Sequence, residues 1–267
     1  MWVFCCGMKR AGSTVQYQLT TEIVERSGVG KRIGFIKPNE FEHTFDIYKD
    51  DEGILVAKLH DYDKGIEKLL NRGEAKAIYV YRDLRDVSIS FIEKGQRLFW
   101  RFILSGEIDN LLIQHRLWNS LDCILVSRYE NMVINLAEET KRIADFLGVE
   151  LDDDSAEQIA ANYSLDRQKQ RIESFDYQNK GFTTGVKKKI KVDPYSLLHE
   201  NHINSGQVGH WKTTLTPIQI GMIEYLGYDW LHEMGYQISQ NWVKQEFVPI
   251  SNFIFRSIAA VRKIVKK

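Results

Sequence analysis

The chain has 267 residues, of which 43% are hydrophobic and 12% aromatic, and it carries 36 basic and 36 acidic side chains. This length and apolar content are enough for a globular domain with a sizeable core. A formal net charge of +0 gives no global reason to expect a nucleic-acid partner, so any anion site must come from local placement of charge.

Cysteine use and hydropathy predict the compartment. The chain has three cysteines, and two of them, Cys5 and Cys6, are adjacent, which argues against a disulfide framework and for a reducing environment. The opening apolar run is too short for a signal peptide, and no apolar stretch approaches the length of a transmembrane helix. We therefore expect a soluble, cytoplasmic protein.

Four apolar segments are predicted to be strands, in chain order 2–6, 54–59, 77–81 and 124–127. Each runs into polar residues, and helical patterns such as 13–25 separate them. An amphipathic stretch, 136–147, follows the last strand, and Gly148 closes it as a C-cap. This alternation predicts an α/β fold with a central parallel sheet flanked by helices. Ligands of such sheets bind at the carboxyl edge.

The second half of the chain is predicted to be mainly helical. Helices are expected at 152–164, 217–225 and 228–234, whereas 168–194 loses periodicity and is expected to be a mobile surface loop. We predict one α/β domain over 1–250, with 251–267 as an appended basic amphipathic helix. Packing on the domain or a homodimer contact is favoured for this helix over a membrane-surface role, because such apolar stripes usually enter cores.

The turn at 7–14, "GMKRAGST", lies between a predicted strand and a predicted helix, which makes it a ready anion cradle. A Walker A loop needs a lysine directly after its second glycine, but Ser13 stands there, and the cations Lys9 and Arg10 come earlier. This disfavours a conventional nucleoside triphosphatase. We expect side chains and backbone N–H groups, and no metal, to neutralise the anion.

A second anion site is predicted in "VYRDLRDVSIS", where Arg82 leaves a buried strand and Ser90 follows eight residues later. A guanidinium fork and a hydroxyl together suit a terminal phosphate. The alternative is that Arg82, Asp83, Arg85 and Asp86 form an ion-pair ladder on the surface, which would contribute little.

"KRAGST" and "YRDLRDVSIS" resemble the two nucleotide-binding signatures of the sulfotransferase family. Three further segments, "KLH" at 58–60, "SRYENM" and "SGQVGHWKTTLT", resemble family motifs and follow in the family's order. The resemblance implies a three-layer P-loop-type fold. It also implies transfer of a sulfuryl group from 3′-phosphoadenosine 5′-phosphosulfate (PAPS) to a hydroxyl or amine, which leaves the desulfated nucleotide PAP and requires no metal. The acceptor would be a small molecule, a lipid or a carbohydrate.

The resemblance also implies roles for individual residues. His60 aligns with the family's general base, Lys58 with the cation that approaches the phosphosulfate, and Arg10 with the P-loop lysine. Tyr129, Ser164 and Tyr163 match positions that hold the adenine. The full predicted nucleotide site comprises Lys9, Arg10, Ala11, Gly12, Ser13, Thr14, Arg82, Ser90, Tyr129, Ser164, Asn204, Ser205 and Gly206.

The clamp for the 3′-phosphate departs from the family pattern. Asn204, Ser205 and Gly206 stand where many members have Arg-Lys-Gly, so two charges are missing unless the lysines at 187–189 compensate. His210 replaces an aspartate before Trp211 and is expected to be structural.

Two other functions stay open, a P-loop nucleotide kinase and a catalytically inactive nucleotide-binding protein. The acceptor pocket is expected to use the segments 43–46, 91–105 and 168–191.

Overall fold

The computed structural model describes residues 1–37, 40–95, 98–174, 193–200, 203 and 205–239. The chain divides into two compact units. Unit 1 consists of residues 1–82 and 114–206, and unit 2 of residues 83–113 together with the chain from residue 207 onward. The predicted helix at 251–267 lies outside the described residues, and the predicted domain boundary at residue 250 stays a prediction.

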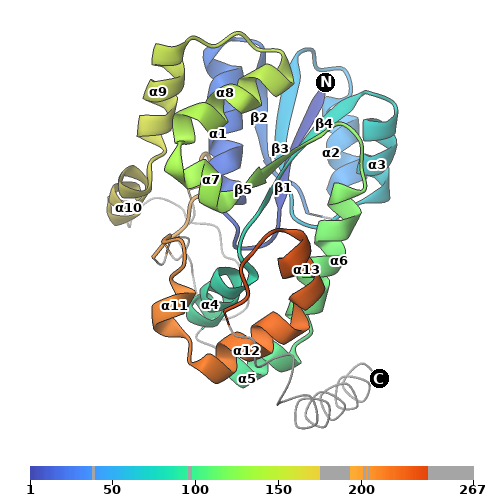
Figure 1. The fold of residues 1–267 in the computed structure, drawn as a ribbon. Coiled ribbons are helices and arrows are strands. Elements are labelled where there is room, and N and C mark those ends of the chain that lie inside the picture. The colour runs from blue at the N-terminus through green and yellow to red at the C-terminus, as the bar shows by residue number, and fades with distance from the viewer. Residues whose placement is uncertain (38–39, 96–97, 175–192, 201–202, 204, 240–267) are drawn as a thin grey trace. The chain divides into compact units, whose positions relative to one another are not determined.

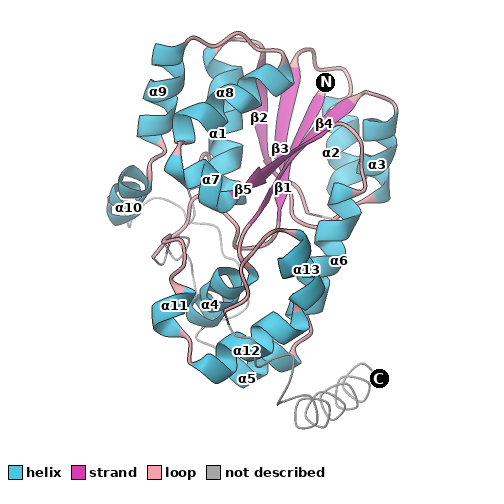
Figure 2. Ribbon diagram, in the orientation of Figure 1, coloured by secondary structure: helices cyan, strands magenta, loops and turns pink. Residues whose placement is uncertain are grey.

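Unit 1 is built on a parallel five-stranded sheet, which Figure 2 shows with its flanking helices. The strands are β1 (Trp2–Gly7), β2 (Gly30–Phe35), β3 (Ile54–Lys58), β4 (Ala75–Tyr81) and β5 (Ile124–Arg128). Their order is β2-β3-β1-β4-β5, so β2 and β3 lie on one side of β1 and β4 and β5 on the other, a reversal in strand order at β1. The predicted α/β fold with a central parallel sheet is confirmed. In such sheets ligands bind at the carboxyl ends of the strands near this reversal.

Strand β2 was not predicted from the sequence. Its residues "GKRIGF" include two glycines and two cations, and most of them are only half buried because the strand lies at the edge of the sheet. The pairing with β3 also shifts register between Arg32 and Gly34. An edge strand of this kind shows neither an apolar run nor strict alternation, so the usual strand signals are weak.

Seven helices of the described part of unit 1 surround the sheet. They are α1 (Ser13–Arg26), α2 (Phe41–Tyr48), α3 (Lys64–Asn71), α7 (Tyr129–Ile134), α8 (Leu136–Leu147), α9 (Asp153–Asn162) and α10 (Leu165–Glu173). Figure 1 shows α1, α8 and α9 over one face of the sheet, and α2 and α3 over the other. Alternate side chains of β1 point to opposite faces of the sheet, as expected for a strand. Val3 and Cys5 join the core with α1, α8 and α9, whereas Phe4 contacts Phe41 of α2.

The ends of these helices follow local chemistry. The side chain of Asn135 accepts a hydrogen bond from Glu138 N–H at the start of α8, and Gly148 ends the helix with φ 74°. Asp152 caps α9 by accepting from Ser155 N–H. Both helices match the prediction. Helix α10 corrects it, because residues 168–173, which were expected in a loop, are helical, and 175–192 lie outside the described residues.

The described part of unit 2 is helical. It contains α4 (Leu84–Gly95), α5 (Phe99–Leu104), α11 (Trp211–Thr214), α12 (Pro217–Leu226) and α13 (Tyr228–Glu233), while α6 (Glu107–Asn119) contributes to both units. A small core joins Ile89, Trp211 and Ile220. Thr216 and Gln219 form a capping box at the start of α12. None of the helices in the described ranges is long and apolar enough to cross a membrane.

Candidate active site

The turn between β1 and α1 is held by backbone contacts to β4. Met8 N–H donates to Val80 O at 2.9 Å, and Ala11 N–H donates to Met8 O at 3.0 Å. Gly12, the N-cap of α1, has φ 92°, and Arg10 has φ 73°, a region that costs a non-glycine residue roughly 1 kcal/mol or more. The first-turn N–H groups of a helix have no acceptor within that helix. The turn therefore combines such donors with two cations at the carboxyl edge of the sheet.

Lys58, the last residue of β3, directs a buried ammonium to this turn. Its backbone pairs with Cys5 of β1, the residue is 4% exposed, and its Nζ donates to Thr14 Oγ1 at 2.5 Å. A buried charge is costly unless polar groups surround it. The contact therefore places a positive charge beside the start of α1, where an anion would gain from both.

His60 lies at the same edge, with Nδ1 3.4 Å from Gly7 O. Because a carbonyl oxygen can only accept, this contact requires the proton of a neutral imidazole on Nδ1 and leaves Nε2 as the acceptor. The backbone of His60 is also fixed, since Trp118 Nε1 donates to His60 O at 3.2 Å. The Phe35 ring lies 5.9 Å from the imidazole, centroid to centroid. Nothing in the sequence pointed to Phe35 or Trp118 as supports for this histidine.

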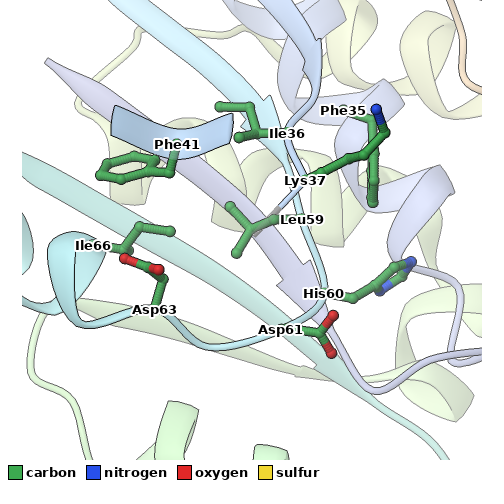
Figure 3. Close-up of a pocket in the computed structure, with 9 residues that line it drawn as sticks. All are labelled: Phe35, Ile36, Lys37, Phe41, Leu59, His60, Asp61, Asp63 and Ile66. Atoms are coloured by element: carbon green, nitrogen blue, oxygen red, sulfur yellow. The ribbon is translucent and has the colours of Figure 1, made fainter. Parts of the chain in front are cut away.

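A pocket adjoins His60 and is shown in Figure 3. It is lined by Phe35, Ile36, Lys37, Phe41, Leu59, His60, Asp61, Asp63 and Ile66. Five of these nine side chains are apolar, and His60 contributes a polar ring at one end. Among the described residues, none of the segments predicted to form an acceptor pocket contributes to its lining.

Lys9 forms an ion pair with Asp61, with Nζ 2.9 Å from Oδ1. Both side chains are about one-third exposed, so the pair contributes little to stability. Its consequence is geometric, because it turns Lys9 toward the chain that follows β3. Asp61 was not predicted to belong to the site, although its position next to His60 is a signal that could have been used.

Arg82 and Tyr129 meet at the ends of β4 and β5. Arg82 is 6% exposed, and its guanidinium carbon lies 4.4 Å from the centroid of the Tyr129 ring. The Tyr129 hydroxyl donates to Gly206 O at 2.8 Å. The structure thus brings together Gly12, Arg82, Tyr129 and Gly206, which the sequence analysis had assigned to one nucleotide site.

The remaining charges of "RDLRD" do not form a surface ladder. Arg85 is 2% exposed and pairs with both Asp83 and Glu224. Asp86, also 2% exposed, accepts from Gly209 N–H and Trp211 N–H. These contacts organise unit 2, so the surface-ladder alternative is wrong.

Other predicted residues are not tested by these contacts. Ser90 belongs to unit 2 and Arg82 to unit 1, so their pairing stays a prediction. The Ser164 hydroxyl donates to Ala161 O at 3.1 Å, and the Tyr163 hydroxyl donates to Glu22 at 3.0 Å. Asn204 and the lysines at 187–189 lie outside the described residues, whereas Ser205 lies within them.

Solved structures share this architecture. A mouse sulfotransferase complexed with PAP matches with a TM-score of 0.63 and 17% identity, over 86% of this chain and 83% of that chain. Retinol dehydratase, in complex with androsterone and the inactive cofactor PAP, matches with a TM-score of 0.59 and 16% identity, over 89% of this chain and 82% of that one. These likenesses show that the chain has the fold of sulfotransferases.

Sequence comparisons agree with the fold. The family described as the sulfotransferase domain matches residues 113–235. Luciferin sulfotransferase from Photinus pyralis is 27% identical over 169 residues, which are 57% of this chain and 45% of that protein. The chain therefore spans less than half the length of this curated relative. The resemblance to the sulfotransferase family is confirmed.

Proposed function

We propose that this protein transfers a sulfuryl group from PAPS to a hydroxyl or amine of a small-molecule, lipid or carbohydrate acceptor, with His60 as the general base. The observation that carries the proposal is the convergence at one sheet edge of the 7–14 turn, the Lys58 ammonium on Thr14 and the His60 ring on Gly7. The matched sulfotransferase domain and the relatives named above support the same activity.

The side chains of the site fit an anionic nucleotide. Gly12 lets the turn pack directly on the Tyr129 ring, Lys58 provides a buried ammonium beside the N-terminal turn of α1, and Arg10 provides a second cation in the turn itself. PAPS would be held by the turn 9–14 at its phosphosulfate and by Arg82 with Ser90 at its 3′-phosphate, and Ser205 and Gly206 would assist there. The family pattern adds Tyr129 and Ser164 at the adenine, and Asn204 at the clamp. Two solved structures with this fold hold PAP, which supports the nucleotide class.

The donor supplies a sulfuryl group on a phosphate leaving group, so the protein needs to position charge more than to form covalent bonds. In this proposal His60 Nε2 accepts the proton of the acceptor hydroxyl or amine, since the other ring nitrogen is committed to Gly7 O. Lys58 and Arg10 stabilise the negative charge that develops on the leaving oxygen. A permanently charged guanidinium can do this, because the leaving phosphate needs charge and no proton.

The pocket beside His60 supports an acceptor with an apolar body. Its lining offers Phe35, Phe41, Leu59 and Ile66 on the way to the imidazole. Apolar pockets with a few placed polar groups are typical of small-molecule sites. Retinol dehydratase has been solved with retinol and with androsterone, both largely hydrocarbon molecules. We therefore propose that an apolar part of the acceptor lies against this lining, with the acceptor hydroxyl at His60.

The proposal is tested by incubating the purified full chain with sulfur-labelled PAPS and a panel of phenols, alcohols and sugars, with and without a metal chelator. We expect labelled product that is insensitive to chelation. A strict magnesium requirement with ATP accepted as donor would instead identify a kinase. Binding of PAP without turnover on any acceptor would point to an inactive nucleotide-binding protein.

Replacing the base gives a sharper test. We expect His60→Ala to lower kcat by roughly two to four powers of ten, the usual scale of general-base catalysis, while the Kd for PAP stays nearly unchanged. The matched control is His232→Ala, since His232 is an exposed histidine of α13. Near-normal turnover in His60→Ala would eliminate the assignment.

A further inference from the structure

Tyr129 contacts three separate parts of the proposed nucleotide site, all within unit 1. A Cβ built on Gly12 would lie 2.7 Å from Tyr129 Cδ2, so the ring edge packs directly on the backbone of the phosphosulfate turn. The Arg82 guanidinium lies over the ring at 4.4 Å, and the hydroxyl donates to Gly206 O at 2.8 Å. The residue is 7% exposed.

These contacts differ from the role that the family pattern assigns to Tyr129, which is to hold the adenine. Its hydroxyl is engaged with Gly206 O, and one of its ring faces carries the guanidinium of Arg82. Arg82 is thereby held against a rigid ring. An arginine otherwise carries about 2 kcal/mol of rotamer entropy, which it must lose when it binds a phosphate. A guanidinium that is already stacked on a ring loses less rotamer entropy when it binds a phosphate.

The edge of the same ring packs on Gly12. Gly12 has φ 92° and leaves no room for a side chain against Tyr129, so the turn and the ring fit each other closely. A ring that is packed on the turn and stacked under Arg82 cannot shift toward one without affecting the other. The Tyr129 ring thus contacts both predicted phosphate-binding groups, the 7–14 turn and Arg82.

We propose that Tyr129 is a positioning residue that couples the phosphosulfate turn to Arg82 and so makes the enzyme selective for 3′-phosphorylated nucleotides. The inference rests on the proposed function, because it takes PAPS as the donor. It predicts that Tyr129 contributes more to PAP affinity through Arg82 and the 3′-phosphate than through the adenine contact that the family pattern implies. PAP and AMP separate these contributions, since both carry adenine and a 5′-phosphate but only PAP has a 3′-phosphate.

The experiment is calorimetric titration of PAP and AMP into the full chain and into Tyr129→Leu and Tyr129→Phe. For Tyr129→Leu we expect PAP affinity to fall about tenfold, the scale of a lost cation–π contact in a desolvated site, and AMP affinity to fall much less. Tyr129→Phe keeps the ring, so it should keep most of the preference for PAP. An equal loss of PAP and AMP affinity in Tyr129→Leu would overturn the inference, because it would show that Tyr129 acts through the adenine or the 5′-phosphate, which both ligands share, and not through the 3′-phosphate.

A double-mutant cycle tests the coupling itself. Arg82→Ala should lower PAP affinity strongly in the parent chain and about tenfold less in Tyr129→Leu, and additive losses would overturn the inference. The matched control is Tyr195→Leu, since Tyr195 of unit 1 also carries an arginine, Arg32, over its ring at 3.3 Å. This control should leave the PAP-to-AMP ratio unchanged. If the parent chain bound no PAP, the proposed function would fall with the inference, whereas retained PAP binding with equal losses would overturn the inference alone.

Discussion

Arg10 sits in a backbone conformation that favours glycine, with φ 73° in the middle of the predicted phosphosulfate turn. A non-glycine residue is held there at a cost, and such outliers cluster at functional sites. The adjacent cation, Lys9, is paired with Asp61. Lys9 is thereby turned toward Asp61, and of the two cations in the turn the proposed mechanism assigns the developing charge to Arg10, together with Lys58 of β3.

Substitution of Arg10 tests this assignment. Arg10→Ala should lower kcat by roughly two to three powers of ten, because its charge matters most as the leaving oxygen becomes negative. Arg10→Lys should recover much of the loss, since a point charge is sufficient without bidentate geometry. Lys9→Ala should be milder. Steady-state kinetics with labelled PAPS measure all three, with the exposed Arg72→Ala as control. Equal effects of Lys9→Ala and Arg10→Ala would contradict the assignment.

His115 is a buried histidine whose charge state makes stability depend on pH. It is 3% exposed, with Nδ1 3.2 Å from the Tyr79 hydroxyl. Burial, assisted by the nearby charge of Arg116, lowers its pKa to about 4. The folded protein therefore keeps this imidazole neutral in a range where the unfolded chain, with an ordinary histidine pKa near 6.5, takes up a proton.

The contribution of His115 to the free energy of unfolding is fully present above pH 6.5 and is lost as the pH falls toward 4. Between pH 7.5 and pH 5 the loss should be about 2 kcal/mol. Urea unfolding of the parent chain and of His115→Gln at both pH values measures it, and the variant should lose less stability on acidification. The exposed His43→Gln is the control. Parallel losses in parent and His115→Gln would refute the argument.

Helix α4 of unit 2 is tied to its neighbours by buried charge. Arg85 near its start pairs with Asp83 at 2.7 Å and with Glu224 of α12 at 2.6 Å, and its guanidinium lies 3.8 Å from the Trp211 ring centroid of α11. Burial alone would lower the pKa of Arg85, but the hydrogen bonds and charges of Asp83 and Glu224 raise it overall. The arginine therefore stays charged and links three helices through one side chain.

Removing one partner of this cluster should be costly. Glu224→Ala leaves a buried guanidinium with one carboxylate fewer, and we expect a loss of about 3 kcal/mol in the free energy of unfolding. Glu224→Gln should lose less, because an amide oxygen can still accept from Arg85. Glu233→Gln on the exposed face of α13 is the control. Thermal or urea unfolding measures the difference. A loss of stability in Glu224→Ala no larger than that in Glu233→Gln would contradict this role for the cluster.

At the scale of the whole molecule, the donor nucleotide should stabilise the fold by mass action. A ligand present at 100 times its Kd adds about 2.7 kcal/mol to the free energy of unfolding. We therefore expect PAP at saturating concentration to raise the Tm by several degrees, and ATP with magnesium to raise it less. Arg82→Ala should reduce the shift with PAP but not the smaller shift with AMP. A larger shift with magnesium-ATP than with PAP would favour a kinase.

Patterns along the sequence were enough to predict the parallel sheet, four of its five strands, the glycine-bearing turn at 7–14 and helices α8, α9, α12 and α13. These features follow from short-range patterns: apolar runs between helical periods, and glycine, asparagine, aspartate or threonine at helix ends. The family motifs added candidate roles for His60, Lys58 and Arg82 that no local pattern could supply.

The contacts between the site residues are visible in the tertiary structure alone. Lys58 reaches Thr14, Lys9 reaches Asp61, His60 turns Nδ1 toward Gly7 O, and Tyr129 packs between Gly12 and Arg82. These partners are far apart in the chain, and their distances depend on strand order and register, which short-range periodicity does not encode. The half-buried edge strand β2 could not be predicted for a related reason. It is held by pairing with β3, and its own residues show little apolar periodicity.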